Sequence, residues 1–176
     1  DNSGCVDSIS YFLDEPTQLT SSFTDSTNIS CFGGSNGSLT ITPSGGTSGY
    51  TYSWARLGGT VTTGTPDSIA INLPHDTVAV IVIDANGCRD TNARIVSEPT
   101  ELTSSFTDST SVSCTALGSA TITPSGGTPG YTYSWSPAVT TGGTDSIANG
   151  LNGATSYRVI ITDNNSCPDT NFITLK

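Results

Sequence analysis

Residues 41–54 read ITPSGGTSGYTYSW, and residues 122–135 read ITPSGGTPGYTYSW. The residues before them repeat as well, because TQLTSSFTDST at 17–27 returns as TELTSSFTDST at 100–110. A period of about 80 residues is longer than a solenoid unit and fits a whole small domain. The sequence therefore predicts two similar domains in tandem.

The repeat divides the chain into three parts. Residues 1–16 are expected to be the C-terminal end of a preceding repeat, because DNSGCVD at their start resembles DANGCRD at 84–90. Residues 17–99 and 100–176 are expected to be one repeat each, the second stopping just before its closing Glu-Pro. Length differences between the repeats fall in Gly- or Asn-containing stretches, as is typical of loops.

Alternating apolar and polar residues predict short strands. The aromatic residues from Tyr50 to Trp54 occupy every second position, and 77–84 is the most apolar run. An Asn-Gly pair at 86–87 favours a tight hairpin. Six or seven short strands per repeat indicate an all-β fold of tandem Ig-like antiparallel β-sandwich repeats arranged head to tail. In the first repeat we expect strands at about 18–24, 38–43, 50–54, 68–73, 77–84 and 91–96.

The same alternation selects the core. Arg158 lies between Tyr157 and Val159 and is expected to face solvent while its neighbours face inward. The side chains expected to be buried are Leu39, Ile41, Trp54, Val78, Val80 and Val82 in the first repeat, and Trp135, Leu151, Tyr157, Val159 and Ile161 in the second.

Composition excludes several classes of function. The formal charge is −10, which disfavours nucleic acid as a partner because such binding needs a basic face. No apolar run approaches the roughly 18 residues of a membrane span. No enzyme is expected either, since the one histidine, His75, is replaced by Ala154 in the other repeat. A general base in one of two near-identical units would be an unusual catalytic design.

Several motifs occur together in both repeats. In the first, Cys31 precedes Gly33-Gly34, Gly45-Gly46 precedes Tyr50 to Trp54, and Asp84 to Cys88 precedes Glu98-Pro99; the second has Cys114, Gly126-Gly127, Tyr131 to Trp135 and Asp163 to Cys167. This combination resembles the SprB-type repeats of giant surface adhesins in gliding Bacteroidota. The resemblance implies Ig- or PKD-like sandwiches in a secreted protein at the exterior of the outer membrane. It does not imply that this chain drives gliding motility.

We consider two pairings of the five cysteines, with free thiols as the third alternative. Pairing within each repeat joins Cys31 to Cys88 and Cys114 to Cys167 and leaves Cys5 unpaired. In an Ig-like sandwich, however, Cys31 and Cys88 lie at opposite ends of a strand about 27 Å long, whereas a disulfide needs Cα atoms within about 7 Å. Head-to-tail stacking instead brings Cys31 to Cys167 across the junction, and we prefer this pairing. Cys5, Cys88 and Cys114 then await partners on other repeats.

The hairpins carry weak candidate Ca²⁺ ligands. Carboxylate and amide oxygens recur there with a spacing that a hard cation accepts, but the same side chains also satisfy backbone donors in metal-free turns. We therefore expect no cofactor, with Ca²⁺ as the alternative. The residues concerned are Asp84, Asn86 and Asp90, and Asp163, Asn165 and Asp169.

Modification is a further expectation. The secretion route that the resemblance implies is associated with O-glycosylation at Asp-Ser or Asp-Thr before an aliphatic residue or Thr. The pattern makes the chain a candidate glycoprotein at Ser8, Ser26, Ser68, Thr77, Ser109 and Ser146.

The leading hypothesis is that the repeats are structural spacers of a long secreted cell-surface adhesin or extracellular filament. Glu98-Pro99 leads into Thr100 without a flexible linker, which favours a stiff rod. The expected partners are neighbouring repeats of the same protein, with lateral self-association into a fibre as a further expectation. The alternative is a multivalent glycan- or surface-binding module that acts through avidity, for which the aromatic row around Tyr52 would be the platform if it is not core.

Overall fold

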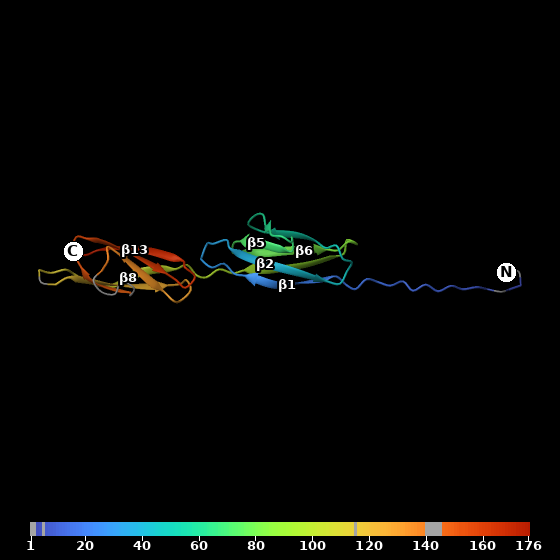
Figure 1. The fold of residues 1–176 in the computed structure, drawn as a ribbon, viewed down its shortest axis with the longest axis horizontal. Coiled ribbons are helices and arrows are strands. Elements are labelled where there is room, and N and C mark those ends of the chain that lie inside the picture. The colour runs from blue at the N-terminus through green and yellow to red at the C-terminus, as the bar shows by residue number, and fades with distance from the viewer. Residues whose placement is uncertain (1–2, 5, 115, 140–145) are drawn as a thin grey trace.

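The computed structural model describes residues 3–4, 6–114, 116–139 and 146–176. Every regular element within these residues is a β-strand, and the paired strands run antiparallel. This confirms the all-β class. The strands form two groups that follow one another along the longest axis of the molecule (Figure 1).

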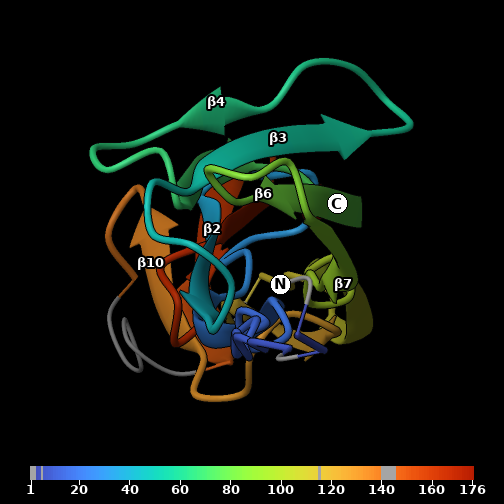
Figure 2. The ribbon, with the colours of Figure 1, turned by 90° about the vertical axis from the view of Figure 1, so that its right-hand side faces the viewer.

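The first group is a two-sheet sandwich. Its strands are β1 (Thr20–Thr27), β2 (Gly37–Ser44), β3 (Thr51–Arg56), β4 (Thr62–Thr63), β5 (Ile69–Leu73), β6 (Asp76–Ile83) and β7 (Arg89–Val96). One sheet has the order β1-β2-β5-β4 and the other the order β3-β6-β7. Seen along the long axis, β3, β6 and β7 follow one another around β2 (Figure 2). The expected strands are all present, with ends displaced by a few residues.

The second group repeats this architecture. Its strands are β8 (Thr103–Thr110), β9 (Gly118–Ser125), β10 (Thr132–Ser136), β11 (Ile147–Leu151), β12 (Ser156–Thr162) and β13 (Pro168–Thr174). The sheet orders are β11-β9-β8 and β10-β12-β13. By the repeat offset, the counterpart of β4 falls on residues 140–145, outside the described residues. The two groups lie within 17–99 and 100–176, and the boundaries themselves stay a prediction.

Each core lies between the two sheets of its group. Leu39 and Ile41 of β2 face Val78 and Val80 of β6, and all four are at most 1% exposed. The β-branched side chains fill the pleated faces because alternate residues of a strand point to one side. Burial is confirmed for every expected core residue except Trp54, and Arg158 is exposed as expected.

Trp54 corrects the expected core. It is only half-buried, although Trp135 at the matching position is 7% exposed. β3 and β10 are both edge strands, so strand position does not account for the difference. The indole of Trp54 donates from Nε1 to the Asp67 carbonyl at 2.9 Å. Its ring packs against Phe23 with a centroid distance of 6.4 Å.

Residues 6–16 run away from the first sandwich as an extended segment (Figure 1). Leu13 occupies the repeat position of Val96, yet it is 92% exposed while Val96 is 1% exposed. The assignment of residues 1–16 to a preceding repeat stays a prediction.

Candidate functional site

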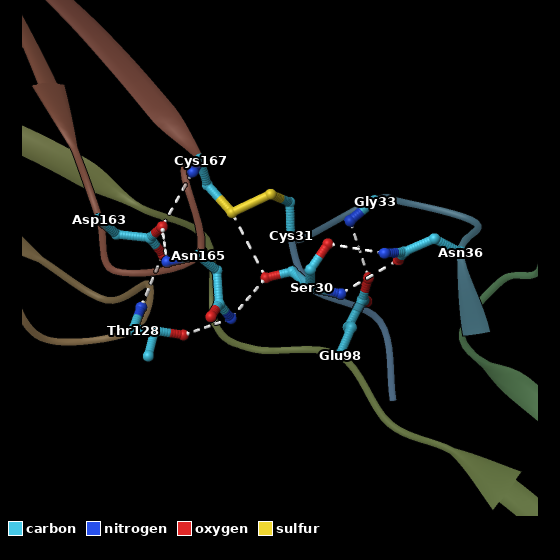
Figure 3. The surroundings of a disulfide bond; sticks show 9 residues. All are labelled: Ser30, Cys31, Gly33, Asn36, Glu98, Thr128, Asp163, Asn165 and Cys167. Carbon is cyan, nitrogen blue, oxygen red and sulfur yellow. Dashed lines mark hydrogen bonds between the residues drawn. A yellow bond between two sulfur atoms is a disulfide. The ribbon is translucent and has the colours of Figure 1, made fainter. Parts of the chain in front are cut away.

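Cys31 and Cys167 form a disulfide that joins the two sandwiches (Figure 3). Cys31 lies in the corner between β1 and β2, and Cys167 lies in the hairpin between β12 and β13. Their Cα atoms are 5.6 Å apart, within the range of protein disulfides. The preferred pairing across the junction is therefore confirmed.

The alternative pairing within each repeat is wrong. Among the described cysteines, Cys88 and Cys114 are free and exposed, so neither Cys31–Cys88 nor Cys114–Cys167 forms. The physical reason is the length of β6, which places the hairpin of Cys88 and the corner of Cys31 at opposite ends of the first sandwich. Cys5 lies outside the described residues.

The hairpin that carries Cys167 is organised around one buried carboxylate. Asp163 is 5% exposed. Its Oδ1 accepts from the backbone N–H groups of Asn165 at 2.9 Å and Cys167 at 2.8 Å, and its Oδ2 accepts from the N–H of Thr128 at 2.8 Å. Gly127 is required beside it, because a Cβ there would lie 2.8 Å from Oδ2. Asp163 thus ties the hairpin to the turn before β10.

These contacts determine the protonation of the carboxyl group. Burial raises the pKa of Asp163, but the three backbone N–H donors favour the charged form, and the pKa is lowered overall. Asp163 therefore accepts hydrogen bonds as a carboxylate at neutral pH, which makes each of them a charge-assisted bond.

The corner that carries Cys31 is held by two other side chains. Asn36 accepts from the Ser30 N–H at 3.1 Å and donates to the Ser30 hydroxyl at 2.8 Å. Glu98, which closes the first repeat, accepts from the Gly33 N–H at 2.7 Å. The corner is thereby fixed by its own loop and by the segment that leads into the next repeat.

The two halves also meet through polar contacts. Asn165 donates from Nδ2 to the Ser30 carbonyl at 3.0 Å and to the Thr128 hydroxyl at 2.9 Å. The Sγ of Cys167 lies 3.3 Å from the same carbonyl oxygen (Figure 3). A groove beside the disulfide is lined by Phe32 of the corner and by Leu102 and Pro168 of the second repeat. One joint thus combines a covalent bond and a hydrogen bond between the repeats, with a groove beside them.

A family model described as the SprB repeat matches the chain twice, over residues 23–59 and 106–140. The chain carries two SprB repeats. No curated protein matches the chain. SprB repeats occur in cell-surface proteins, and this chain is accordingly a repeat module of the surface-adhesin kind. No helix in the described part of the chain is long and apolar enough to cross a membrane.

The first SprB repeat contains the same hairpin as the second. Asp84 accepts from the N–H groups of Thr47, Asn86 and Cys88 at 2.9, 3.0 and 2.8 Å. Asn86 donates from Nδ2 to the Thr47 hydroxyl at 2.8 Å, as Asn165 does to Thr128. The backbone N–H of Thr47, together with the other two donors, lowers the pKa of Asp84 against the opposing effect of burial. The same hydrogen-bonded hairpin therefore occurs in both repeats.

The candidate Ca²⁺ ligands have protein partners in this structure. Asp84 and Asp163 accept from backbone N–H groups, whereas Asp90 and Asp169 accept from the hydroxyls of Ser21 and Ser104. The described residues contain no cluster of three or more His, Cys, Asp or Glu side chains that could hold a metal ion. In each repeat, the two aspartates that the sequence places on one hairpin thus have separate hydrogen-bond partners: one binds backbone N–H groups, and the other binds a serine hydroxyl of the first strand.

The remaining candidates are distributed over the surface. His75 lies 3.5 Å from Glu98 at the edge of the joint. Of the candidate O-glycosylation sites, Ser8, Thr77 and Ser109 are exposed and Ser26, Ser68 and Ser146 are half-buried, and their modification stays a prediction.

Sequence patterns alone do not predict the polar contacts of the joint. The sequence indicates Asn86 and Asn165 only as cation ligands or turn residues and Glu98 only as part of the short junction, and it indicates no role for Asn36. The sequence does contain one signal for the hairpin asparagines: Asn86 and Asn165 each lie two residues before a cysteine, Cys88 and Cys167.

Proposed function

We propose that the two SprB repeats are non-catalytic spacers in a long secreted cell-surface adhesin, and that their joint makes the array stiff. The observation that carries this proposal is the Cys31–Cys167 disulfide between consecutive repeats. A spacer needs a repeated shape and a defined angle between units. The two similar sandwiches support the first requirement, and a disulfide between them supports the second.

The joint has two separate connections. The chain passes from β7 to β8 through residues 97–102, and the disulfide joins the repeats at a second place. A single short connection permits bending and twisting, whereas a second attachment removes most of that freedom. The Asn165 hydrogen bond to Ser30 then favours one orientation.

The surface chemistry supports a spacer at the exterior of the outer membrane. The charge of −10 disfavours association with other acidic surfaces. A spacer without catalysis is supported by Ala154, which replaces His75 in the second repeat. An antibody raised against the chain is expected to label intact cells of its source.

The stiffness is tested by NMR relaxation of the oxidised chain and of the double variant Cys31→Ser/Cys167→Ser. In the oxidised chain, amides of both repeats should report one common, anisotropic tumbling time. In the double variant, each repeat should tumble faster and separately, because only residues 97–102 connect them covalently. The variant Cys88→Ser/Cys114→Ser is the matched control, since it removes two cysteines without touching the disulfide. Unchanged tumbling of the first variant would overturn the proposed role of the joint.

A second candidate function rests on the aromatic row of the first repeat. Tyr50 and Tyr52 are half-buried and line a surface groove with Pro66 and Asp67. Tyrosine faces beside polar groups suit glycan stacking, and many repeats would supply avidity. A glycan array probed with a multimer of the chain tests this candidate. Binding that is lost in Tyr52→Ala would support a glycan-binding module, and no binding to any glycan would leave the spacer function alone.

A further inference from the structure

We propose that two copies of this chain join end to end through a disulfide between Cys88 of one copy and Cys114 of the other, forming a joint of the same kind as Cys31–Cys167. The inference concerns the two free cysteines and does not depend on the spacer function. It rests on the equivalence of the positions that the four cysteines occupy.

Cys88 occupies the same position in the first repeat as Cys167 in the second. Both follow a buried aspartate by four residues and are fixed by a hydrogen bond from their own backbone N–H to its Oδ1, at 2.8 Å in both repeats. Asn86 likewise occupies the position of Asn165 and is oriented by the hydroxyl of Thr47, as Asn165 is by Thr128. Asn86 of the first repeat is thus held in the same way as Asn165, whose side-chain amide crosses the existing joint.

The surface beside Cys88 also matches the existing joint. In the joint, the groove is lined by Leu102, Cys167 and Pro168 together with the corner residues Cys31 and Phe32. The first repeat has a groove lined by Leu19, Cys88 and Arg89 at the corresponding positions. Among the described residues, the lining of this second groove includes Glu15 and Pro16 of the extended segment but no corner residues of another repeat, and Cys88 is exposed. A corner of the Cys31 type is therefore the shape that this groove receives.

The second repeat places a cysteine at the corresponding corner, at the other end of the molecule, in a loop that is two residues shorter and lacks the counterparts of Gly33 and Asn36. Cys114 follows Ser113 between β8 and β9, just as Cys31 follows Ser30 between β1 and β2. Cys114 is exposed, and it lines an apolar groove with Val112 and Leu175. One chain thus presents the hairpin half of a joint at its first repeat and the corner half at its second. A second copy has the same two halves and is therefore a complementary partner. The contact joins different surfaces of the two copies, so it is heterologous, and further copies can add at either end.

Bond formation needs an oxidant, for which a small-molecule disulfide such as oxidised glutathione suffices. The thiolate of one cysteine attacks the small disulfide, forms a mixed disulfide and releases one small thiol. The thiolate of the partner cysteine then displaces the second small thiol. Two protein thiols are oxidised to one disulfide, and one small disulfide is reduced to two thiols.

The test uses the full chain with Cys5→Ser, so that Cys88 and Cys114 are the remaining free cysteines. After incubation with oxidised glutathione, a non-reducing digest is analysed by mass spectrometry for the three intermolecular peptides. Docking raises the effective concentration of the two thiols to about the millimolar range. We therefore expect the Cys88–Cys114 peptide to exceed either symmetrical peptide by about tenfold or more. Intact Cys31–Cys167 in the same digest confirms that the internal joint is preserved.

Two outcomes would overturn the proposal. One is a roughly twofold excess of the mixed peptide, which is what random collision of two thiol types gives; the other is a chain that remains monomeric. Asn86→Ala should lower the yield of the mixed peptide, while the matched variant Asn165→Ala should leave it unchanged. An equimolar mixture of Cys88→Ser and Cys114→Ser chains should stop at the dimer, because each chain then has one half of the new joint.

Discussion

The side-chain amide of Asn165 in the second SprB repeat donates to the backbone carbonyl of Ser30 in the first, at 3.0 Å. This hydrogen bond crosses the joint beside the disulfide and is held in direction by Thr128. It relates two residues that are 135 positions apart in the chain, so it reports the packing of one repeat on the other.

Removing the amide of Asn165 should weaken docking once the disulfide no longer holds the repeats together. In the Cys31→Ser/Cys167→Ser background, we expect Asn165→Ala to lower the ratio of the docked to the undocked population by a factor of about 3 to 10, which corresponds to about 1 kcal/mol for one hydrogen bond. Chemical shifts of residues 30–36 measure that population. Asn86→Ala is the matched control, because Asn86 makes the same bond within its hairpin but none across the joint. Equal effects of both variants would assign the loss to the hairpin itself.

The two tryptophans should differ in their contribution to stability. Trp135 is 7% exposed, so Trp135→Ala should cost about 3–5 kcal/mol in the free energy of unfolding of the second repeat. Trp54 is half-buried at an edge strand, and Trp54→Ala should cost the first repeat about 2 kcal/mol. Calorimetry of each variant measures the two losses. A cost for Trp54→Ala as large as that for Trp135→Ala would contradict the different burial of the two indoles.

The two tryptophans show which features of the core can be predicted from the sequence and which cannot. Alternation along β3 and β10 correctly predicts which face Trp54 and Trp135 occupy, because side chains of a strand alternate strictly. It does not say how far the neighbouring loop covers the indole, since that depends on residues 55–66 and their counterparts, where the repeats diverge most. Local pattern predicts the face of a side chain, and tertiary packing determines its burial.

At the joint, too, one feature can be predicted from the sequence and others cannot. The pairing of Cys31 with Cys167 was accessible from the sequence, because strand length excluded the shorter-range pairing and tandem stacking left a partner. The Asn165 bond to Ser30 and the Glu98 bond to Gly33 were not accessible. The first connects segments whose separation depends on the angle between the repeats, and no residue pattern within one repeat encodes that angle. The second lies within the first repeat and joins two loop segments 65 residues apart, which only the folded sandwich brings together.

Acid should destabilise both repeats through their buried aspartates. The backbone N–H of Thr47 and two further donors lower the pKa of Asp84, and backbone donors outweigh burial in lowering that of Asp163, relative to an ordinary value of 3.8. A carboxyl group whose pKa is lowered by folding stabilises the folded state above its unfolded pKa, and that contribution is lost as the pH falls through the folded value. The melting temperature should therefore be insensitive to these groups from neutral pH to about 5 and fall below about pH 4.

The variant Asp163→Asn measures how much of the acid destabilisation comes from the charge of Asp163. Asp163→Asn directs a donor at a backbone N–H, so the second repeat should melt at a lower temperature at pH 7 and lose less on acidification than the unaltered chain. Asp84→Asn is the matched variant and should act in the same way on the first repeat. Calorimetric scans between pH 2.5 and 7 measure both transitions. An unaltered acid dependence in the double variant would show that other carboxyl groups carry it.

One residue of the second hairpin has a backbone conformation that its side chain disfavours. Ser166 has a φ of 68°, whereas the first repeat has Gly87 at this position with a φ of 84°. Left-handed backbone costs a residue with a Cβ about 1–2 kcal/mol, and glycine adopts it freely. Part of this difference is offset because glycine loses more entropy on folding. Ser166→Gly should therefore stabilise the second repeat by about 0.5–1 kcal/mol.

The reciprocal exchange makes this prediction specific. Gly87→Ser has open space around its new Cβ, so its cost comes from the backbone and not from a clash. It should lower the melting temperature of the first repeat by about 4–8 °C per kcal/mol lost, while Ser166→Gly raises that of the second on the same scale. Both turns keep the hydrogen bond from residue 87 or 166 to the aspartate carbonyl, at 3.0 Å in each repeat, so the change isolates φ. Stabilisation by serine at position 87 would show that the hydroxyl contributes more than the backbone strain costs.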